Sequence, residues 1–283
     1  MNITYFNGNF IPEENVRISP DDRGFLFGDG IYEVMKWYSG FFFDPESHLA
    51  RLKRSLREVR INWPEADTFP SLARELIKIN NMEGREALIY MEVTRGEAPR
   101  NHSFPDPEVK ATSYAFAREI DHGKTVTPQG VKVILRKDIR WSRCDIKSVS
   151  LLANTLSFQD AHERGMKECI FVRNGVITEG SRSNIFLVAG GTLYTHPESE
   201  YILSGVTRKN LIRMAKECGR EVKEVAFPEK DLGMIEEAFI CNTTAEVTPV
   251  TFFDTVQIGN GMPGPVTLEL FEKFQKEIIA LKG

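Results

Sequence analysis

Lys147 and Glu179 are the two residues whose types could do chemistry together. Lys147 lies in segment 138–149 (DIRWSRCDIKSV), and Glu179 lies in segment 178–184 (TEGSRSN). A lysine amine can form a Schiff base with an aldehyde, and a carboxylate can pair with a protonated ring nitrogen. These are the groups that pyridoxal phosphate (PLP) chemistry requires from a protein. Because 27% of the residues are charged, the pair alone would more often be solvated surface than a site.

A turn that leads into a helix could bind a phosphate group. Segment 203–207 (LSGVT) precedes a predicted helix over 207–218, and a helix N-terminus offers free N–H groups to an anion. Gly205 would allow close backbone approach, although an ordinary helix cap is the simpler interpretation of this turn. A phosphate site usually adds a cation. By spacing alone, Arg51 is one of several arginines on a solvated helix face.

Two further segments hold residues that could contact a substrate. Arg100 and His102 lie two residues apart in loop 94–102 (TRGEAPRNH), where an arginine fork could bind a carboxylate through two hydrogen bonds. Most exposed loops of this composition have no such role. Segment 22–34 (DRGFLFGDGIYEV) is rich in glycine and aromatic residues, which predicts a loop entering a strand over 31–37 that carries Tyr32.

The elements that position these residues form two predicted domains of an α/β (α+β) chain. A small N-terminal domain covers residues 1–118, a polar linker covers 119–128, and a larger C-terminal domain covers 129–283. Apolar spacing predicts helices over 46–62, 69–80, 149–164, 207–218 and 266–281. Strands are predicted over 31–37, 87–94, 131–136, 169–172, 176–178, 184–188, 192–195 and 238–241. Asn174-Gly175 predicts a type I′ hairpin, and Gly190-Gly191 a similar turn.

The composition argues against several classes of protein. The chain of 283 residues has a net charge of −4, which gives no reason to expect a nucleic-acid partner. It contains no apolar run long enough to predict a membrane span, and we expect no signal peptide. The cysteines lack a C-x-x-C pair, which predicts reduced thiols in a cytoplasmic protein, and the histidines lack metal-ligand spacing. We therefore expect no disulfide and no metal.

Segments 145–154 (DIKSVSLLAN) and 179–184 (EGSRSN) resemble the fold-type IV PLP-dependent aminotransferases, and within that class the D-amino acid aminotransferases. The resemblance implies a two-domain protein with PLP at the domain interface, working as a homodimer whose active sites are shared across subunits. It implies that Lys147 is catalytic and that Arg51 pairs with the cofactor phosphate. The implied cofactor-binding residues are Arg51, Lys147, Glu179, Leu203, Val206, Thr207, Thr243 and Thr244.

The same resemblance implies the substrates, a D-amino acid such as D-alanine or D-glutamate and a 2-oxo acid such as 2-oxoglutarate or pyruvate. The implied substrate-binding residues are Tyr32, Arg100 and His102, with the last two acting in the partner subunit's site. Arg182 departs from the pattern, since close relatives usually have a small hydroxyl residue there. It could contact the site and favour dicarboxylates, or pair on the surface.

Three other functions remain open at this point. A branched-chain L-amino acid aminotransferase shares nearly all of the cofactor site, and aminodeoxychorismate lyase shares the fold and the lysine. A non-catalytic PLP-binding protein is the third. The intact set of Lys147, Glu179 and Arg51 argues against the last.

Overall fold

The computed structural model describes residues 2–121 and 128–282, which group into two compact units. Of the described residues, the first unit is formed mainly by 2–121 and Ile146–Leu151, and the second by 128–145 and Leu152–Leu281. The segment that carries Lys147 therefore groups with the first unit, whereas the sequence interpretation assigned it to a C-terminal domain over 129–283. Of the predicted linker over 119–128, residues 122–127 lie outside the described residues.

The first unit is built on an antiparallel sheet with the strand order β2-β1-β5-β4-β3. Along β4, residues 87, 89, 91 and 93 are fully buried and alternate with half-buried ones, as expected for a strand with one face on the core. The strands are β1 (Ile3–Phe6), β2 (Asn9–Pro12), β3 (Gly30–Tyr38), β4 (Glu86–Thr94) and β5 (Thr112–Glu119).

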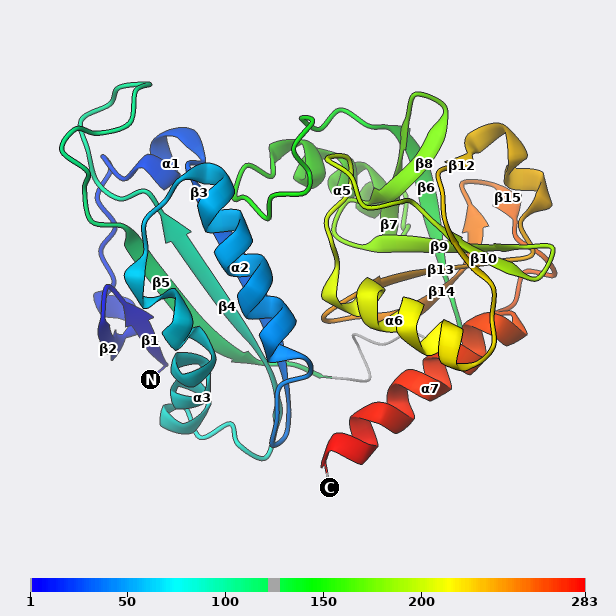
Figure 1. Cartoon of the computed structure of the whole chain (residues 1–283), viewed down its shortest axis with the longest axis horizontal. Coiled ribbons are helices and arrows are strands. Elements are labelled where there is room, and N and C mark those ends of the chain that lie inside the picture. The colour runs from blue at the N-terminus through cyan, green and yellow to red at the C-terminus, as the bar shows by residue number, and fades with distance from the viewer. Residues whose placement is uncertain (1, 122–127, 283) are drawn as a thin grey trace. The chain divides into compact units, whose positions relative to one another are not determined.

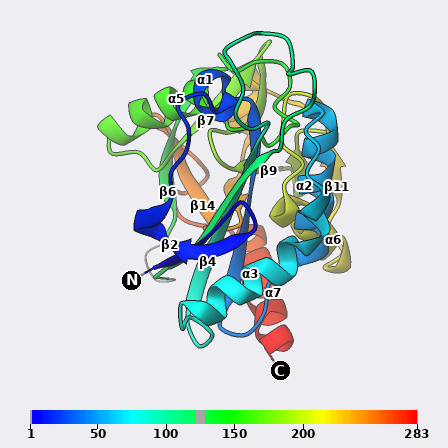
Figure 2. The same ribbon diagram turned by 90° about the vertical axis from the view of Figure 1, so that its left-hand side faces the viewer.

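Helices α2 (Pro45–Val59) and α3 (Phe69–Ile79) pack on the buried face of this sheet (Figures 1 and 2). The short helix α1 (Arg23–Phe27) precedes β3, and 3-10 turns occupy Glu13–Asn15 and Pro64–Thr68. Helix α2 buries Leu52 and Leu56, which lie four residues apart and so share the apolar face on which the prediction of this helix rested. It ends three residues before the predicted end because Arg60 adopts a left-handed conformation that closes the helix (φ 56°).

The second unit contains a ten-stranded mixed sheet in which β6 lies between β14 and β7, parallel to both. Its order is β11-β10-β9-β13-β14-β6-β7-β8-β12, with β15 paired to β14. The strands are β6 (Val131–Lys137), β7 (Glu168–Arg173), β8 (Val176–Gly180), β9 (Asn184–Ala189), β10 (Thr192–Thr195), β11 (Val222–Glu224), β12 (Phe227–Pro228), β13 (Glu237–Asn242), β14 (Glu246–Phe253) and β15 (Val256–Gln257).

Three helices and a 3-10 turn accompany this sheet. They are α5 (Leu152–Glu163), which packs on β6 and β7, α6 (Val206–Glu217), which packs on β13, α7 (Pro265–Lys282), and the turn Glu229–Met234 (Figure 1). Asn174 and Gly175 both have positive φ (52° and 76°), which confirms the predicted type I′ hairpin between β7 and β8. Gly190 and Gly191, between β9 and β10, also both have positive φ (55° and 73°), as expected for a similar turn.

Helix α5 begins at Leu152, three residues after the predicted start at Val149. The residues before it extend along β3, since Ser148 forms an antiparallel bridge with Ile31 and the Val149 N–H donates to the Gly30 carbonyl (3.1 Å). Pairing with a strand edge satisfies backbone groups that a helical turn would otherwise have satisfied. The lysine segment is thereby fixed to β3.

No helix in the described part of the chain is long and apolar enough to cross a membrane. The four cysteines are free, and three of them are buried. Among the described residues, no group of three or more His, Cys, Asp or Glu side chains could hold a metal ion.

Candidate active site

Lys147 is held against Tyr32 of β3. The Tyr32 N–H donates to the Lys147 carbonyl (2.9 Å), and the Lys147 N–H donates to the hydroxyl of Ser55 on α2 (3.3 Å). The Lys147 ammonium lies over the Tyr32 ring, 4.1 Å from its centroid. The residue is half-buried, and these hydrogen bonds fix both its N–H and its carbonyl.

Arg51 belongs to a buried charged cluster with Glu33 and His48. Its guanidinium donates to both oxygens of Glu33, Nε to Oε2 (2.9 Å) and Nη2 to Oε1 (2.5 Å), while His48 Nδ1 lies 3.0 Å from Oε1. Glu33 is the fourth residue of β3 and is fully buried. Sequence reasoning missed it, because acidic residues are usually solvated. The one available signal was the strand alternation, which places Glu33 on the same face as Ile31 and Met35, both apolar and fully buried.

The electrostatics of this cluster favour one ion pair. Burial raises the pKa of Glu33, but the charge of Arg51 and the hydrogen bonds from His48 and Arg51 outweigh it, so the net pKa lies well below the ordinary value. Burial lowers the pKa of His48, more than its hydrogen bond to Glu33 raises it. The cluster therefore consists of a carboxylate, a guanidinium and a neutral imidazole, and Glu33 fixes the direction of Arg51.

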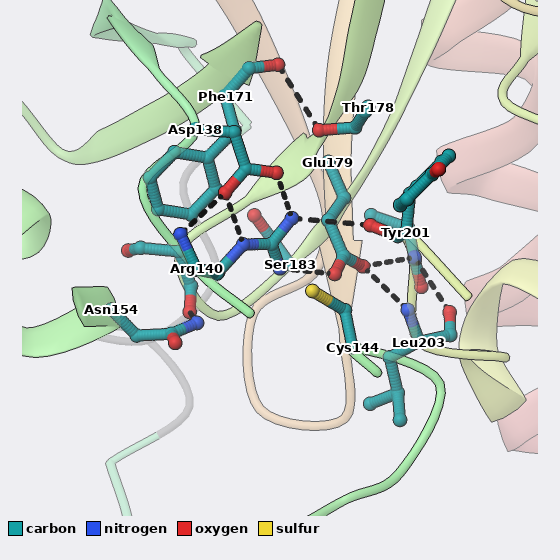
Figure 3. Close-up of polar contacts among 12 residues, drawn as sticks. Asp138, Arg140, Cys144, Asn154, Phe171, Thr178, Glu179, Ser183, Tyr201 and Leu203 are labelled. Carbon is teal, nitrogen blue, oxygen red and sulfur yellow. Dashed lines mark hydrogen bonds and ion pairs between the residues drawn. The ribbon is translucent and has the colours of Figure 1, made fainter. Parts of the chain in front are cut away.

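Glu179 accepts hydrogen bonds from three donors (Figure 3). Arg140 Nη1 donates to Oε1 (2.5 Å), while Asn184 Nδ2 and the Leu203 N–H donate to Oε2 (both 3.0 Å). Burial raises the pKa of Glu179 to about 7, although the charge and hydrogen bond of Arg140 oppose the shift. Because all three partners are donors, they favour the ionised carboxylate, as does any further cation placed beside it.

Arg140 is held in turn by Asp138, which accepts from Nε and Nη2 (both 3.0 Å), and its guanidinium lies over the Phe171 ring (4.3 Å to the centroid). Figure 3 shows this guanidinium between the two carboxylates. Sequence reasoning missed the roles of Asp138 and Arg140. They stand in the quoted segment 138–149, but a charged pair two residues apart carries no signal that it is buried.

The loop between β8 and β9 is organised by buried Glu168. This carboxylate accepts from the hydroxyls of Ser181 and Ser183 (2.9 Å for Ser183), and the Gly180 N–H donates to the Ser183 carbonyl (2.7 Å). The loop thereby holds Glu179 at the end of β8 and Asn184 at the start of β9.

Two turns could supply phosphate donors in the second unit. Helix α6 begins at Val206, with Gly205 as its N-cap and without a side-chain cap, so its first N–H groups do not have the usual side-chain acceptor. In the other turn, Asn242 Oδ1 accepts from the N–H groups of Thr244 (2.9 Å) and Ala245 (2.7 Å), which fixes the backbone around Thr243.

Arg182 lies in the loop after Glu179 and is more than half exposed, with a side-chain exposure of 56%. Its guanidinium lies over the Phe158 ring (4.1 Å to the centroid), and Nε is 3.9 Å from Glu168 Oε2. Both partners belong to the second unit. A contact of Arg182 with a substrate stays a prediction.

Arg100 and His102 both lie on an exposed loop of the first unit and approach the ring of Phe27. The Arg100 guanidinium is 5.1 Å from the centroid of that ring, and the His102 ring is 5.4 Å from it. The structure thus brings the two predicted carboxylate donors to one aromatic side chain.

The predicted site residues divide between the two units. Those in the first unit are Tyr32, Arg51, Arg100, His102 and Lys147, and those in the second are Glu179, Arg182, Leu203, Val206, Thr207, Thr243 and Thr244. Together, these residues offer the kinds of chemical group that binding of PLP requires. The first unit offers an amine and a guanidinium, and the second offers a buried carboxylate and a helix N-terminus.

The chain matches a family of known proteins over most of its length. The amino-transferase class IV family matches residues 30–253. The chain is 40% identical over 279 residues to a D-alanine aminotransferase of Staphylococcus haemolyticus, with 98% of each protein covered. It is 39% identical over 280 residues to a D-alanine aminotransferase of Listeria monocytogenes serotype 4b, with 98% of this chain and 96% of that protein covered.

Solved structures with the same fold include branched-chain amino acid aminotransferases. The Escherichia coli enzyme superposes with a TM-score of 0.91 at 26% identity, over 97% of this chain and 94% of that one. A second branched-chain enzyme, complexed with N-(5'-phosphopyridoxyl)-L-glutamate, has a TM-score of 0.88 at 26% identity, over 99% of this chain and 94% of that one. These matches establish the two-domain fold.

Proposed function

The chain belongs to the amino-transferase class IV family, and from that premise we propose that it transfers the amino group of a D-amino acid to a 2-oxo acid, with PLP as its cofactor. D-alanine or D-glutamate is the donor, and 2-oxoglutarate or pyruvate is the acceptor. The observation that carries the proposal is the 40% identity to a D-alanine aminotransferase over nearly the whole of both proteins.

The branched-chain L-aminotransferases are the second candidate, because their structures superpose so well. Their identity to this chain is 26%, compared with 40% for the D-alanine aminotransferase. The loop with Arg100 and His102 also favours the D-amino acid, since it offers the substrate carboxylate two donors.

When bound, PLP supplies an aldehyde for amines and a ring that accepts electrons from Cα. We propose that Lys147 is its attachment residue and that Arg51, Thr207 and Thr244 bind its phosphate. Val206 and Thr243 contribute to the same phosphate site through their backbone, and Leu203 packs on the ring. Glu33 keeps the guanidinium of Arg51 in one orientation through its two hydrogen bonds.

Lys147 is also the general base: its amine takes the proton from Cα of the substrate, holds it as an ammonium and would deliver it to the carbon of the cofactor's aldehyde group. Its ammonium lies over the Tyr32 ring (4.1 Å), so Tyr32 guides the amine and borders the substrate. Glu179 keeps a proton on the ring nitrogen. Arg140 and Asn184 donate to its two oxygens, which holds the carboxylate in one orientation (2.5 and 3.0 Å).

We propose further that the protein is a homodimer in which Arg100 and His102 complete the partner subunit's site. An aromatic row on the sheet face opposite α2 and α3 supports this. Tyr32, Tyr90 and Phe116 stack in sequence, with centroids 5.6 and 5.2 Å apart. A cavity of about 530 Å³ borders the row, and exposed Ile18 and Phe25 line it. Such exposed apolar surface is typical of a protein interface.

We also propose that the protein works in the cytoplasm. The basis is its four free cysteines, since a reducing compartment keeps thiols in that state.

The proposed function is tested by comparing amino donors. Purified protein loaded with PLP is incubated with 2-oxoglutarate and either D-alanine or L-leucine. The oxo acid formed from each amino donor is then measured. We expect pyruvate from D-alanine and little product from L-leucine. A clear preference for L-leucine would instead support the branched-chain alternative. Borohydride reduction followed by peptide mapping should find the cofactor attached to Lys147.

A further inference from the structure

The loop that carries Arg100 and His102 rests on helix α1. Phe27, the last residue of α1, is half-buried and has three cationic or aromatic neighbours. Arg23 lies 4.7 Å and Arg100 lies 5.1 Å from its ring centroid, and the His102 ring is tilted by 56° at 5.4 Å. One ring therefore contacts both proposed carboxylate donors.

Arg23 fixes the backbone of the same loop from the other end of α1. Its Nη1 donates to the carbonyl of Asn101 (2.5 Å) and to that of Ser103 (3.3 Å). These carbonyls flank His102 in the chain. The guanidinium is buried, and its Nε donates to Asp29 (2.9 Å), so it cannot easily turn away from the loop.

The base of the loop is anchored through the same aspartate. Arg95 donates to both oxygens of Asp29 (2.8 and 3.0 Å) and to the carbonyls of Val59 and Arg60 at the end of α2 (both 2.7 Å). Asp29 thus joins Arg23 to Arg95, and these hydrogen bonds tie the loop to α1 and α2.

We propose that Phe27 and Arg23 are positioning residues that determine recognition of the substrate carboxylate. Arg23 holds the backbone on both sides of His102, and Phe27 holds the side chains of Arg100 and His102 against one ring. The proposal rests on the proposed function, because it takes Arg100 and His102 as the carboxylate donors. The ligand class is an α-carboxylate, and the effect is on its binding.

The physical reason is preorganisation. Arg100 is exposed and long, and a free arginine side chain loses much rotamer freedom when it is fixed on a carboxylate. A guanidinium that already lies against an aromatic ring has lost part of that freedom before the substrate arrives. Removing the ring should therefore weaken carboxylate binding, while the proton transfer at Lys147 keeps its rate.

The test uses the dimeric holoenzyme and the variant Phe27→Leu, which removes the ring and keeps an apolar side chain. Propionate is the probe, since it has the carboxylate and no amine, and its Kd is measured by calorimetry without turnover. We expect its Kd and the KM for D-alanine to rise about fivefold, the change that about 1 kcal/mol produces, with kcat within about twofold. The Kd for PLP should not change.

Two variants control for a merely structural effect. Phe27→Trp keeps an aromatic face and should restore both constants toward those of the wild type. Phe10→Leu removes an exposed ring from the contact with Tyr5 in the same unit and should leave both constants unchanged. Arg23→Met should raise the same constants. Arg23→Met removes a buried charge beside Asp29. If this variant does not fold, the measurements on Phe27→Leu alone decide the proposal.

Unchanged propionate binding in Phe27→Leu would overturn the proposal. Arg100→Leu separates that outcome from a failure of the proposed function. If Arg100→Leu weakens propionate binding and Phe27→Leu does not, the carboxylate site stands and α1 has no part in positioning it. If the wild type does not convert D-alanine, the proposed function fails, while propionate binding still reports on α1.

Discussion

The side-chain oxygen of Asn184 lies 2.0 Å from where a Cβ atom on Gly205 would be, so Gly205 is the residue against which Asn184 packs. Gly205 has an extended conformation open to any residue (φ −72°), so the close approach, and not the backbone angle, requires glycine. The nitrogen of the same amide donates to Glu179 (3.0 Å) and to the Leu203 carbonyl (2.9 Å). One side chain thus connects the proposed partner of the ring nitrogen to the turn before α6.

Gly205→Ala should therefore weaken cofactor binding. The added methyl group displaces Asn184, which loses hydrogen bonds to Glu179 and Leu203. We expect the Kd for PLP, from an absorbance titration, to rise about tenfold, the equivalent of about 1.4 kcal/mol. Gly233→Ala is the matched control, because a Cβ there meets nothing within 4 Å.

A double-mutant cycle checks the cause of that loss. Asn184→Ala removes the group with which the new methyl collides, so Gly205→Ala should cost much less in that background. Fully additive effects on the Kd for PLP would show that Gly205 acts independently of Asn184.

Much of the fold could be predicted from the sequence, because its signals are local. The apolar stripe of α2 and the Asn174-Gly175 turn depend on neighbours within a few residues. The predicted start of α5 was wrong by three residues, because Ser148 and Val149 pair with β3, a strand more than a hundred residues earlier. Such a pairing leaves no mark in the spacing of the segment itself.

The site shows the same limit. Residue type alone singled out Lys147 and Glu179, but the roles of these two residues and of Arg51 came from resemblance to a family, and those assignments stay predictions. Glu33 and Arg140 lie in segments that were singled out for other residues, but burial and pairing decide their role, and neither property can be read from a single charged residue. The pairing of Glu33 with Arg51, which lies 18 residues later in the chain, could be recognised only in the structure.

Glu179→Gln should slow catalysis strongly and change how stability depends on pH. A neutral amide cannot hold a proton on the ring nitrogen, so we expect kcat to fall by at least about a hundredfold. Burial raises the pKa of Glu179 to about 7 in the folded protein, above its ordinary value of 4.5. The folded state therefore binds this proton more tightly, and that stabilisation is lost as pH rises from about 4.5 through 7.

The variant lacks this titration. In urea unfolding of the protein freed of PLP, Glu179→Gln should gain stability relative to the wild type as pH rises from about 5 to about 8. Asp138 continues to accept from Arg140 in the variant, so its guanidinium keeps a charged partner (3.0 Å). If the difference in free energy of unfolding between Glu179→Gln and the wild type did not vary with pH, that result would contradict the raised pKa of Glu179.

Glu33→Gln should destabilise the first unit. Glu33 is the buried partner of Arg51, and breaking a buried ion pair by removing one charge typically costs about 3–5 kcal/mol. The pKa of Glu33 is lowered by Arg51 and His48 against the effect of burial, so its stabilisation is present above about pH 4.5 and is lost as pH falls below it. In urea unfolding, the variant should therefore have a lower free energy of unfolding than the wild type at about pH 7, and the difference should be smaller in acid. Equal differences at both pH values would contradict the ion pair's role.

The final prediction tests whether Arg100 acts in the partner subunit's site. Lys147→Ala and Arg100→Leu homodimers should both be nearly inactive with D-alanine. After subunit exchange, a mixed dimer has one site with both lesions. Its other site combines Lys147 from the Arg100→Leu chain with Arg100 from the Lys147→Ala chain. About half of the dimers are mixed and each has one intact site, so activity should recover to about a quarter of wild type per subunit. If Arg100 instead serves its own subunit, no mixed dimer has an intact site and activity stays at the sum of the two variants. Exchange is verified by mass spectrometry of differently tagged chains, so a lack of recovery would rule out the shared site.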